Sequence, residues 1–291
     1  MAYGVQTLNS LSGRVNTMHG EISRYNSLSG STAQCDLSFS TDFTMASFSA
    51  TTPASGGVFI GINGNGGSYT INSSADQTAI GVNKCIGVLR MATGTTSNST
   101  GYAAIATGPI LTGIPTPASG FVTKYEMEIM LETEGTLFTT AVPGQIEAGF
   151  RTDTLNTDPT DGVYFQWNQP SVGGDTTWYV VFRNTTEERV NTAVTVAANK
   201  LYQMYLSVER NSAGTFTTSW RIKNLTDNTD TSGTAAPSNT SFYPSASGDQ
   251  MRVGAVIHKQ TTTTTTSRYI ILDYIHCRIQ VPLERSFLIS G

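Results

Sequence analysis

Apolar and polar residues alternate with a period of two in short runs over most of the chain after residue 31. Residues 201–210 (LYQMYLSVER) place Tyr202, Met204 and Leu206 on one edge, and residues 215–223 (TFTTSWRIK) repeat the pattern. Successive side chains of a β-strand point to opposite faces, so this alternation predicts half-buried strands. The period therefore restricts most of the chain to β-structure.

Similar short runs follow one another along the chain, and no helical crossover pattern separates them. Residues 224–248 form a polar excursion, and residues 108–120 (GPILTGIPTPASG) contain three prolines, which favours a connection that crosses between sheets. More than ten short strands joined by turn residues predict an all-β antiparallel sandwich. The predicted strands are 37–41, 58–62, 79–91, 102–106, 124–131, 145–151, 162–167, 178–183, 190–196, 201–210, 215–223, 251–258 and 268–281.

The composition narrows the class of protein. Charged residues make up 13% of the chain, about half of the usual share. The 38% of hydrophobic residues and the net charge of −4 predict a folded chain, and the acidic balance without a basic cluster argues against nucleic-acid binding. We find no secretory signal pattern and no apolar run long enough for a membrane span. Cys35, Cys85 and Cys277 lie far apart without a C-x-x-C motif, which argues against a zinc site.

The first 30 residues follow a different period. Between residues 4 and 28 the apolar residues occupy the a and d positions of a heptad repeat, which predicts a short helix that packs against copies of itself. The alternative is one amphipathic helix packed on its own β domain. By analogy with fibrous proteins we expect a homotrimer. The predicted oligomerisation residues are Leu8, Leu11, Val15, Met18, Ile22 and Tyr25.

These two periods divide the chain into two predicted parts. Residues 1–30 form the helical segment for oligomerisation or anchoring, and residues 31–291 form the β-sandwich. A length of roughly 200–250 residues is common for one sandwich domain. A further boundary within residues 108–120 would split the sandwich into two.

The order of strands from residue 80 to 281 resembles the concanavalin A-like (lectin/glucanase) jelly roll of phage structural proteins. The segments that carry the resemblance are KYEMEIM, EAGFR, DGVYFQW, TWYVVFRN, LYQMYLSVER, TFTTSWRIK and ILDYIHCRIQ. In phage virion proteins this domain often follows a short oligomerising helix. The resemblance implies a β-sandwich used for carbohydrate binding, host attachment or capsid decoration.

The resemblance leads to a functional prediction. We expect a non-enzymatic virion surface protein, made in the host cytoplasm, that assembles with other virion proteins and binds a host surface glycan as a tail-fibre or receptor-binding component. Capsid decoration, as a cement or head-fibre protein, is the alternative. A glycan depolymerase and a cellular lectin are less favoured.

The carboxylates argue against an enzyme. Catalytic members of the resembled superfamily carry an E-x-D-x-x-E type strand, whereas Glu126 and Glu128 share a face here without a third carboxylate in register. The next two, Glu132 and Glu134, lie beyond the predicted strand. Two neighbours on one strand are typical of a solvated face, so we predict no catalytic residue and no cofactor.

Four aromatic residues are candidates for glycan contact. Tyr164, Trp167, Trp178 and Tyr179 could form a platform on which the apolar face of a sugar stacks. The alternative is that their rings pack in the core and at the rim of the sandwich. The alternation requires some of them to point inward.

A loop with three aspartates is a candidate calcium site. Asp153, Asp158 and Asp161 supply the oxygen ligands that Ca²⁺ prefers. Asp-Pro and Asp-Gly are also ordinary turn formers, and the spacing of an EF-hand is absent. The sequence leaves both interpretations open, and we predict no metal.

The heptad prediction leads to a direct test. Replacing Val15 and Ile22 together by aspartate should leave the sandwich folded and break the oligomer, because charges at two a positions oppose packing of the seam. Mass photometry of the wild-type and double-variant proteins measures this. A wild-type monomer at micromolar concentration, or an assembly that survives the change, would contradict the prediction.

Overall fold

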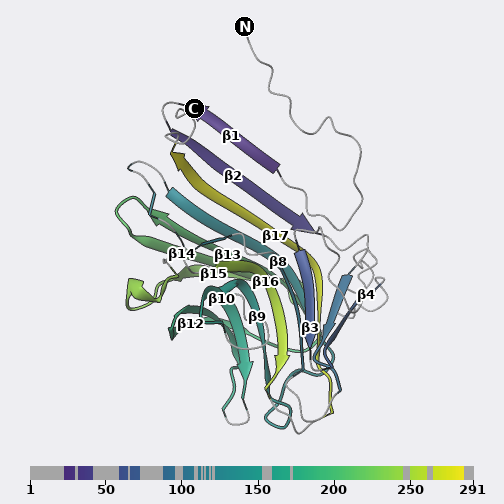
Figure 1. The fold of residues 1–291 in the computed structure, drawn as a ribbon. Coiled ribbons are helices and arrows are strands. Elements are labelled where there is room, and N and C mark those ends of the chain that lie inside the picture. Colours follow the sequence, from purple (N-terminus) through teal and green to yellow (C-terminus); the bar gives the residue numbers. More distant parts are fainter. Residues whose placement is uncertain are drawn as a thin grey trace, which may run out of the picture.

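The computed structural model consists of two antiparallel β-sheets that lie face to face (Figure 1). It describes residues 23–29, 32–41, 59–64, 66–72, 88–95, 101–107, 111–112, 114, 116–117, 119, 122–152, 159–170, 173–244, 250–260 and 265–284. Within these ranges the helical structure is one 3₁₀ turn, η3 (Thr240–Phe242). No helix among the described residues combines the length and the apolar character needed to cross a membrane.

The first sheet holds the first and the last strand of the described residues. Its main order is β1-β2-β17-β8-β13-β14-β15, and β5 adds to β17 with β4 beside it. The strands are β1 (Ser23–Ser29), β2 (Thr32–Thr41), β4 (Ser68–Asn72), β5 (Val88–Ala92), β8 (Val122–Glu134), β13 (Lys200–Asn211), β14 (Phe216–Asn224), β15 (Thr229–Ala235) and β17 (Tyr269–Glu284).

The second sheet is built around a run of consecutive hairpins. Its order is β12-β11-β10-β9-β16-β6-β3, and the short β7 pairs with β16. The strands are β3 (Phe59–Gly64), β6 (Tyr102–Thr107), β7 (Leu111–Thr112), β9 (Gly144–Thr152), β10 (Asp161–Gln169), β11 (Thr177–Asn184), β12 (Thr186–Thr195) and β16 (Gln250–Lys259).

The chain passes repeatedly between the two sheets. From β8 in the first sheet it enters the β9–β12 meander of the second, returns for β13–β15, and then inserts β16 between β9 and β6. The last strand, β17, inserts between β2 and β8 of the first sheet. Strands that cross between two packed sheets and return beside early strands give jelly-roll connectivity. The predicted fold class, an all-β antiparallel jelly-roll sandwich, is confirmed.

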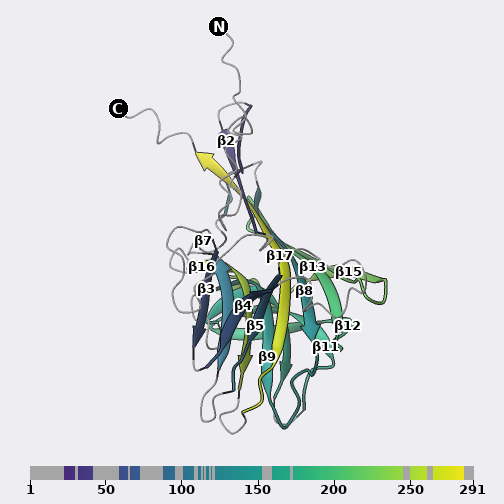
Figure 2. The same ribbon diagram turned by 90° about the vertical axis from the view of Figure 1, so that its right-hand side faces the viewer.

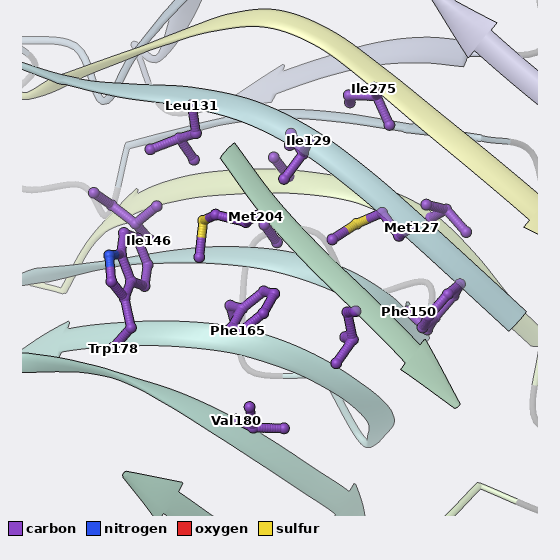
Figure 3. Packing of buried hydrophobic residues seen from close by; sticks show 14 of the residues in the cluster. Met127, Ile129, Leu131, Ile146, Phe150, Phe165, Trp178, Val180, Met204 and Ile275 are labelled. Carbon is purple, nitrogen blue, oxygen red and sulfur yellow. The ribbon is translucent and has the colours of Figure 1, made fainter. Parts of the chain in front are cut away.

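The apolar half of the alternation fills the space between the sheets (Figure 3). On β8 the buried positions alternate with half-exposed ones, as the sequence predicts. Met127 and Ile129 of β8, Met204 of β13, and Ile146 and Phe165 of the second sheet are at most 1% exposed. Full burial of one such side chain contributes about 1.5–3 kcal/mol, so the inner faces supply most of the favourable free energy of folding.

Aromatic rings join the two sheets directly. The ring centroids of Tyr125 on β8 and Phe150 on β9 lie 6.0 Å apart. Trp178 on β11 and Tyr202 on β13 meet edge to face at 5.8 Å. Edge-to-face contacts of this kind add roughly 0.5–1.5 kcal/mol to the burial of the rings.

The predicted N-terminal helix is wrong where the structure describes it. Residues 23–28 lie in β1, and Tyr25 pairs with Asp36 of β2 instead of occupying a d position. Ser23, Asn26 and Ser27 have low helix propensity. As a strand, the same segment forms a ladder of backbone hydrogen bonds with β2. The other five predicted oligomerisation residues, and the oligomer itself, stay predictions; Leu8, Leu11, Val15, Met18 and Ile22 lie outside the described residues.

The polar excursion predicted at 224–248 contains a strand, β15, at one edge of the first sheet. Its sequence (TDTSGTA) lacks the apolar half of the alternation, and all of its residues but Gly233 and Ala235 are exposed. Pairing with β14, from Thr218↔Ala235 to Asn224↔Thr229, defines it as a strand. An edge strand buries little side-chain surface, so hydrophobic periodicity could not reveal it.

Figure 2 shows that β1, β2 and the end of β17 extend beyond the two-layered part of the molecule. The core reaches along β17 as far as Ile279, which is 2% exposed and pairs with Tyr125 of β8. The division of the chain at residue 30, and a boundary within 108–120, stay predictions.

The packing of the core leads to a stability prediction. Replacing Phe165 by alanine should lower the free energy of unfolding by about 3–5 kcal/mol, because the side chain is fully buried between the sheets. Urea unfolding followed by intrinsic fluorescence measures the change. The exposed Thr217→Ala on β14 is the control and should change stability by less than about 0.5 kcal/mol. A loss below about 1 kcal/mol for the Phe165 variant would contradict this packing.

Candidate functional site

Polar side chains on β8, β13, β14 and β15 form part of the outer face of the first sheet, the face that points away from the second sheet. Strand register places these residues in rows across the sheet. In the central row Glu128 lies opposite Tyr205, Tyr205 opposite Arg221, and Arg221 opposite Ser232. The neighbouring row runs from Gln203 through Lys223 to Asp230, so charged and amide groups from four strands come together.

A hollow of about 520 Å³ lies over these rows. Its size falls within the range of small-molecule sites, roughly 300–1,000 Å³. Most of its lining residues carry a hydroxyl, amide, carboxylate or cationic group. The lining residues are Glu128, Gln203, Tyr205, Ser219, Trp220, Arg221, Lys223, Ser232, Gly233 and Thr234.

Glu128 is held in place by two side chains on neighbouring strands. The Gln203 amide donates to Oε1 of Glu128 at 2.5 Å, and the Tyr274 hydroxyl donates to the same oxygen. Burial and the hydrogen bond to Glu128 raise the pKa of Tyr274, so its hydroxyl remains a donor. Both donors converge on Oε1, and Oε2 accepts no hydrogen bond from a described residue.

Glu126, two positions earlier on the same face, is more heavily paired. The Tyr205 hydroxyl donates to its Oε1 at 2.5 Å, Lys124 Nζ lies 2.7 Å from the same oxygen, and Arg278 NH1 lies 3.6 Å from Oε2. Burial by itself would raise the pKa of Glu126, but the hydrogen bonds from Lys124 and Tyr205 and the charges of Lys124 and Arg278 lower it. Burial and Glu126 raise the pKa of Tyr205 to about 12.

Strand β14 carries the two cationic residues of the lining, Arg221 and Lys223. Arg221 donates from Nε to Oδ1 of Asp230 at 2.8 Å and makes a second contact to Oδ2. The hydrogen bond from Arg221 is the main cause of the lowered pKa of Asp230, and the charge of Lys223 also lowers it. Lys223 makes no hydrogen bond or ion pair with another residue that the structure describes.

This arrangement suits binding better than glycoside hydrolysis. A hydrolytic pair needs one protonated carboxyl and a second carboxyl across the scissile bond. Glu126 and Glu128 share one face of one strand, as predicted, and the lowered pKa of Glu126 keeps it ionised near neutral pH. The site therefore offers fixed hydrogen-bond donors and acceptors, and Glu126 is not suited to act as the proton donor.

The four predicted glycan-contact aromatics do not form a surface platform. Tyr164 and Trp178 are fully buried and Trp167 is 3% exposed, so these rings present no face to a sugar. Only Tyr179 is half-buried, and the guanidinium of Arg189 covers its ring at 4.2 Å. Trp167 and Trp178 lie at inward-facing positions of their strands and belong to the hydrophobic core.

Tyr164 belongs instead to a buried polar layer on the other side of the second sheet. Glu147 accepts from the amides of Gln145 at 3.0 Å and Gln166 at 3.1 Å and pairs with Arg151. All four of these residues are at most 2% exposed. Burial and the charge of Glu147 raise the pKa of Tyr164. Removing one member would leave a buried charge, so we assign this layer a structural role.

The predicted calcium loop lies mostly outside the described residues. Asp153 and Asp158 are not described, whereas Asp161 begins β10 and its backbone N–H donates to the Thr152 hydroxyl at 3.1 Å. The part of the chain that the structure describes holds no group of three or more potential metal ligands. Cys277 is a free thiol and is fully buried in the core.

Most residues of the hollow were not predicted from the sequence. The sequence indicates only one property of Gln203, Lys223 and Ser232. Each lies at a polar position, either in an alternating segment or in the polar segment that follows one. Nothing in the sequence states that β8, β13, β14 and β15 are neighbours, and that adjacency creates the site.

Comparisons with known proteins bear on the fold. No protein-family model matches this sequence, and no curated protein sequence matches it. A solved structure of a protein of unknown function from Shewanella oneidensis MR-1 is similar, with a TM-score of 0.56 and 14% identity over 88% of this chain and 90% of that chain. At that identity the similarity shows a shared fold alone.

Two further structures are less similar. Lectin II from Ulex europaeus has a TM-score of 0.48 and 10% identity over 83% of this chain and 98% of its own. An endo-β-1,4-glucuronan lyase from the fungus Trichoderma reesei has a TM-score of 0.44 and 16% identity over 80% of this chain and 95% of its own. Similarities at these TM-scores support no argument about the activity of this chain.

The pairing of Glu126 predicts a pH-dependent stability. Because its pKa is lowered in the folded protein, the ionised carboxylate stabilises the fold above the ordinary pKa of 4.5, and this contribution disappears as the pH falls through the lowered value. Glu126→Gln should therefore cost about 1–2 kcal/mol at pH 7 and much less in acid.

Urea unfolding across the acid range checks this difference. Glu209→Gln, on neighbouring β13, is the control, because Glu209 makes no ion pair with a described residue; it should stay within about 0.5 kcal/mol of wild type. A Glu126→Gln penalty that is the same at pH 7 and in acid would show that the charge of Glu126 is not responsible.

Proposed function

We propose that the protein is a non-enzymatic carbohydrate-binding protein and that the hollow on the outer face of the first sheet is its binding site. The observation that carries the proposal is the lining of the hollow, in which donors and acceptors from four strands face a space of about 520 Å³. Sugar hydroxyls both donate and accept, so they can satisfy both kinds of group at once.

Several of these groups are held before a ligand arrives. Gln203 and Tyr274 fix Glu128, and the Tyr205 hydroxyl is fixed on Glu126. Side chains that are already ordered lose less conformational freedom on binding, which favours affinity. Exposed hydroxyls at the open side, such as Ser232, leave room for the ligand to enter.

The non-enzymatic part of the proposal rests on the geometry of the carboxylates. Two carboxyls that cleave a glycosidic bond lie on either side of it, and one of them must be protonated. Glu126 and Glu128 stand side by side on β8, and each is engaged by a tyrosine hydroxyl. Release of reducing sugar from a bound polysaccharide would overturn this part.

The biological setting in this proposal is a phage particle. Host attachment through a tail-fibre or receptor-binding role is favoured, and capsid decoration is the alternative. The support for this setting is the sequence resemblance in strand order to phage structural proteins. Imaging of labelled protein on particles would distinguish a fibre from a shell location.

A blocking substitution tests the binding site. Ser232→Trp should place a large ring over the hollow and lower the affinity for a bound oligosaccharide at least tenfold, while the exposed strand β15 tolerates the change. Binding is found on a glycan array and measured by isothermal titration calorimetry.

The matched control is Thr195→Trp, which adds the same ring at an exposed position of β12 in the second sheet. It should bind like the wild-type protein. Absence of binding across the array would contradict the proposed function, and a Ser232→Trp variant with unchanged affinity would contradict the proposed location.

A further inference from the structure

We infer that the hollow selects neutral sugars with vicinal hydroxyls and rejects sugar acids. This inference rests on the proposed function, because it names the class of carbohydrate that the same hollow would take. The juxtaposition that carries it is a fixed carboxylate on β8 and an ammonium group on β14, which line the same space.

The acceptor is Oε2 of Glu128. Both internal donors, the Gln203 amide and the Tyr274 hydroxyl, bind Oε1. They orient the carboxylate without using Oε2, which receives no hydrogen bond from a described residue. A carboxylate fixed in this way is an acceptor that a ligand hydroxyl can meet without reordering the side chain.

The donor is the Lys223 ammonium. Lys223 lies opposite Gln203 across the β13–β14 pair, one row away from Arg221, which lies in the same row as Glu128. Arg221 is engaged by Asp230 through two contacts, so its charge is largely compensated. Lys223 lies opposite the same Asp230 but makes no hydrogen bond or ion pair with another described residue, so its ammonium can donate to an incoming oxygen.

The charges at the hollow balance once Asp230, which lies beside the lining, is included. Arg221 pairs with Asp230, which also lies opposite Lys223, and Glu128 lines the hollow together with both cations. These two positive and two negative groups leave no net charge for a ligand to neutralise. Two adjacent hydroxyls fit this balance, because one can donate to Oε2 of Glu128 while the other accepts from Lys223. Hydroxyl groups combine both abilities, and vicinal hydroxyls present them side by side.

A sugar carboxylate fits poorly. It offers only acceptors at neutral pH, so it can satisfy Lys223 but leaves the Glu128 carboxylate without a donor. It would also place a negative charge beside the Glu128 carboxylate, and like charges at short range repel. The hollow should therefore discriminate between two sugars that differ only in a CH₂OH group and a carboxylate.

Matched pairs of oligosaccharides provide the probes. Glucose, galactose and mannose oligosaccharides are each compared with the uronate oligosaccharide of the same stereochemistry and linkage, by calorimetry at pH 7. The wild-type protein should bind at least one neutral member, and it should bind that member at least tenfold more tightly than its acidic counterpart.

Two variants assign the selectivity to the two groups. Glu128→Gln keeps the shape and the contact to Gln203 but removes the charge, and it should reduce the preference for the neutral probe to less than threefold. Lys223→Met removes the donor and should lower the affinity for the neutral probe about tenfold. Glu209→Gln, outside the hollow, is the control for charge removal and should retain the wild-type preference. Circular dichroism verifies that each variant is folded.

The outcomes separate this inference from the proposed function. If the wild-type protein binds a uronate as tightly as its neutral partner, and Ser232→Trp blocks both, the hollow binds sugars but the selectivity is wrong. If Glu128→Gln keeps the full neutral preference, the role of Glu128 is wrong. If no member of the three pairs binds, this inference fails, and binding elsewhere on a wider array would still leave the proposed function standing.

Discussion

Burial of the apolar inner faces of the two sheets is the interaction on which the rest of the structure depends. Met127, Met204 and Phe165 are each fully buried between the sheets, within one continuous cluster. Because side chains alternate along a strand, fixing one face inward fixes the other outward. A slip of one residue in β8 would send Glu126 and Glu128 into the core, so the register of the polar surface is enforced by the hydrophobic core.

The polar groups on the outer faces of the two sheets differ in their exposure. On the second sheet, Glu147 and Arg151 form a fully buried pair that two glutamine amides complete. On the first sheet, the carboxylate of Glu128 is also fixed by neighbours, but it lines an open hollow. Polar groups that are completely satisfied within the protein stabilise or specify the fold, whereas a fixed group that keeps a free lone pair can serve a ligand.

Sequence reasoning succeeded where one local period was sufficient. The alternation in residues 124–131, 201–210 and 215–223 predicted β8, β13 and β14, and it correctly placed Glu126 and Glu128 on a common face. It failed where backbone pairing outweighed side-chain pattern. Tyr25 fits a heptad by spacing, yet its segment forms a strand paired with β2, and the polar β15 has no apolar period to detect.

The sequence by itself determined that this chain folds as an antiparallel sandwich, because a period of two in apolar residues admits few other solutions. Only the tertiary structure decided which strands are neighbours. That adjacency turned Trp167 and Trp178, candidates for a sugar surface, into core residues, and brought Glu128 and Lys223 from distant segments to one hollow. Periodicity is a local property of the chain, whereas a site made of side chains from four strands depends on strand pairing, including that of β8 with β13, whose partner residues lie 67 to 89 positions apart.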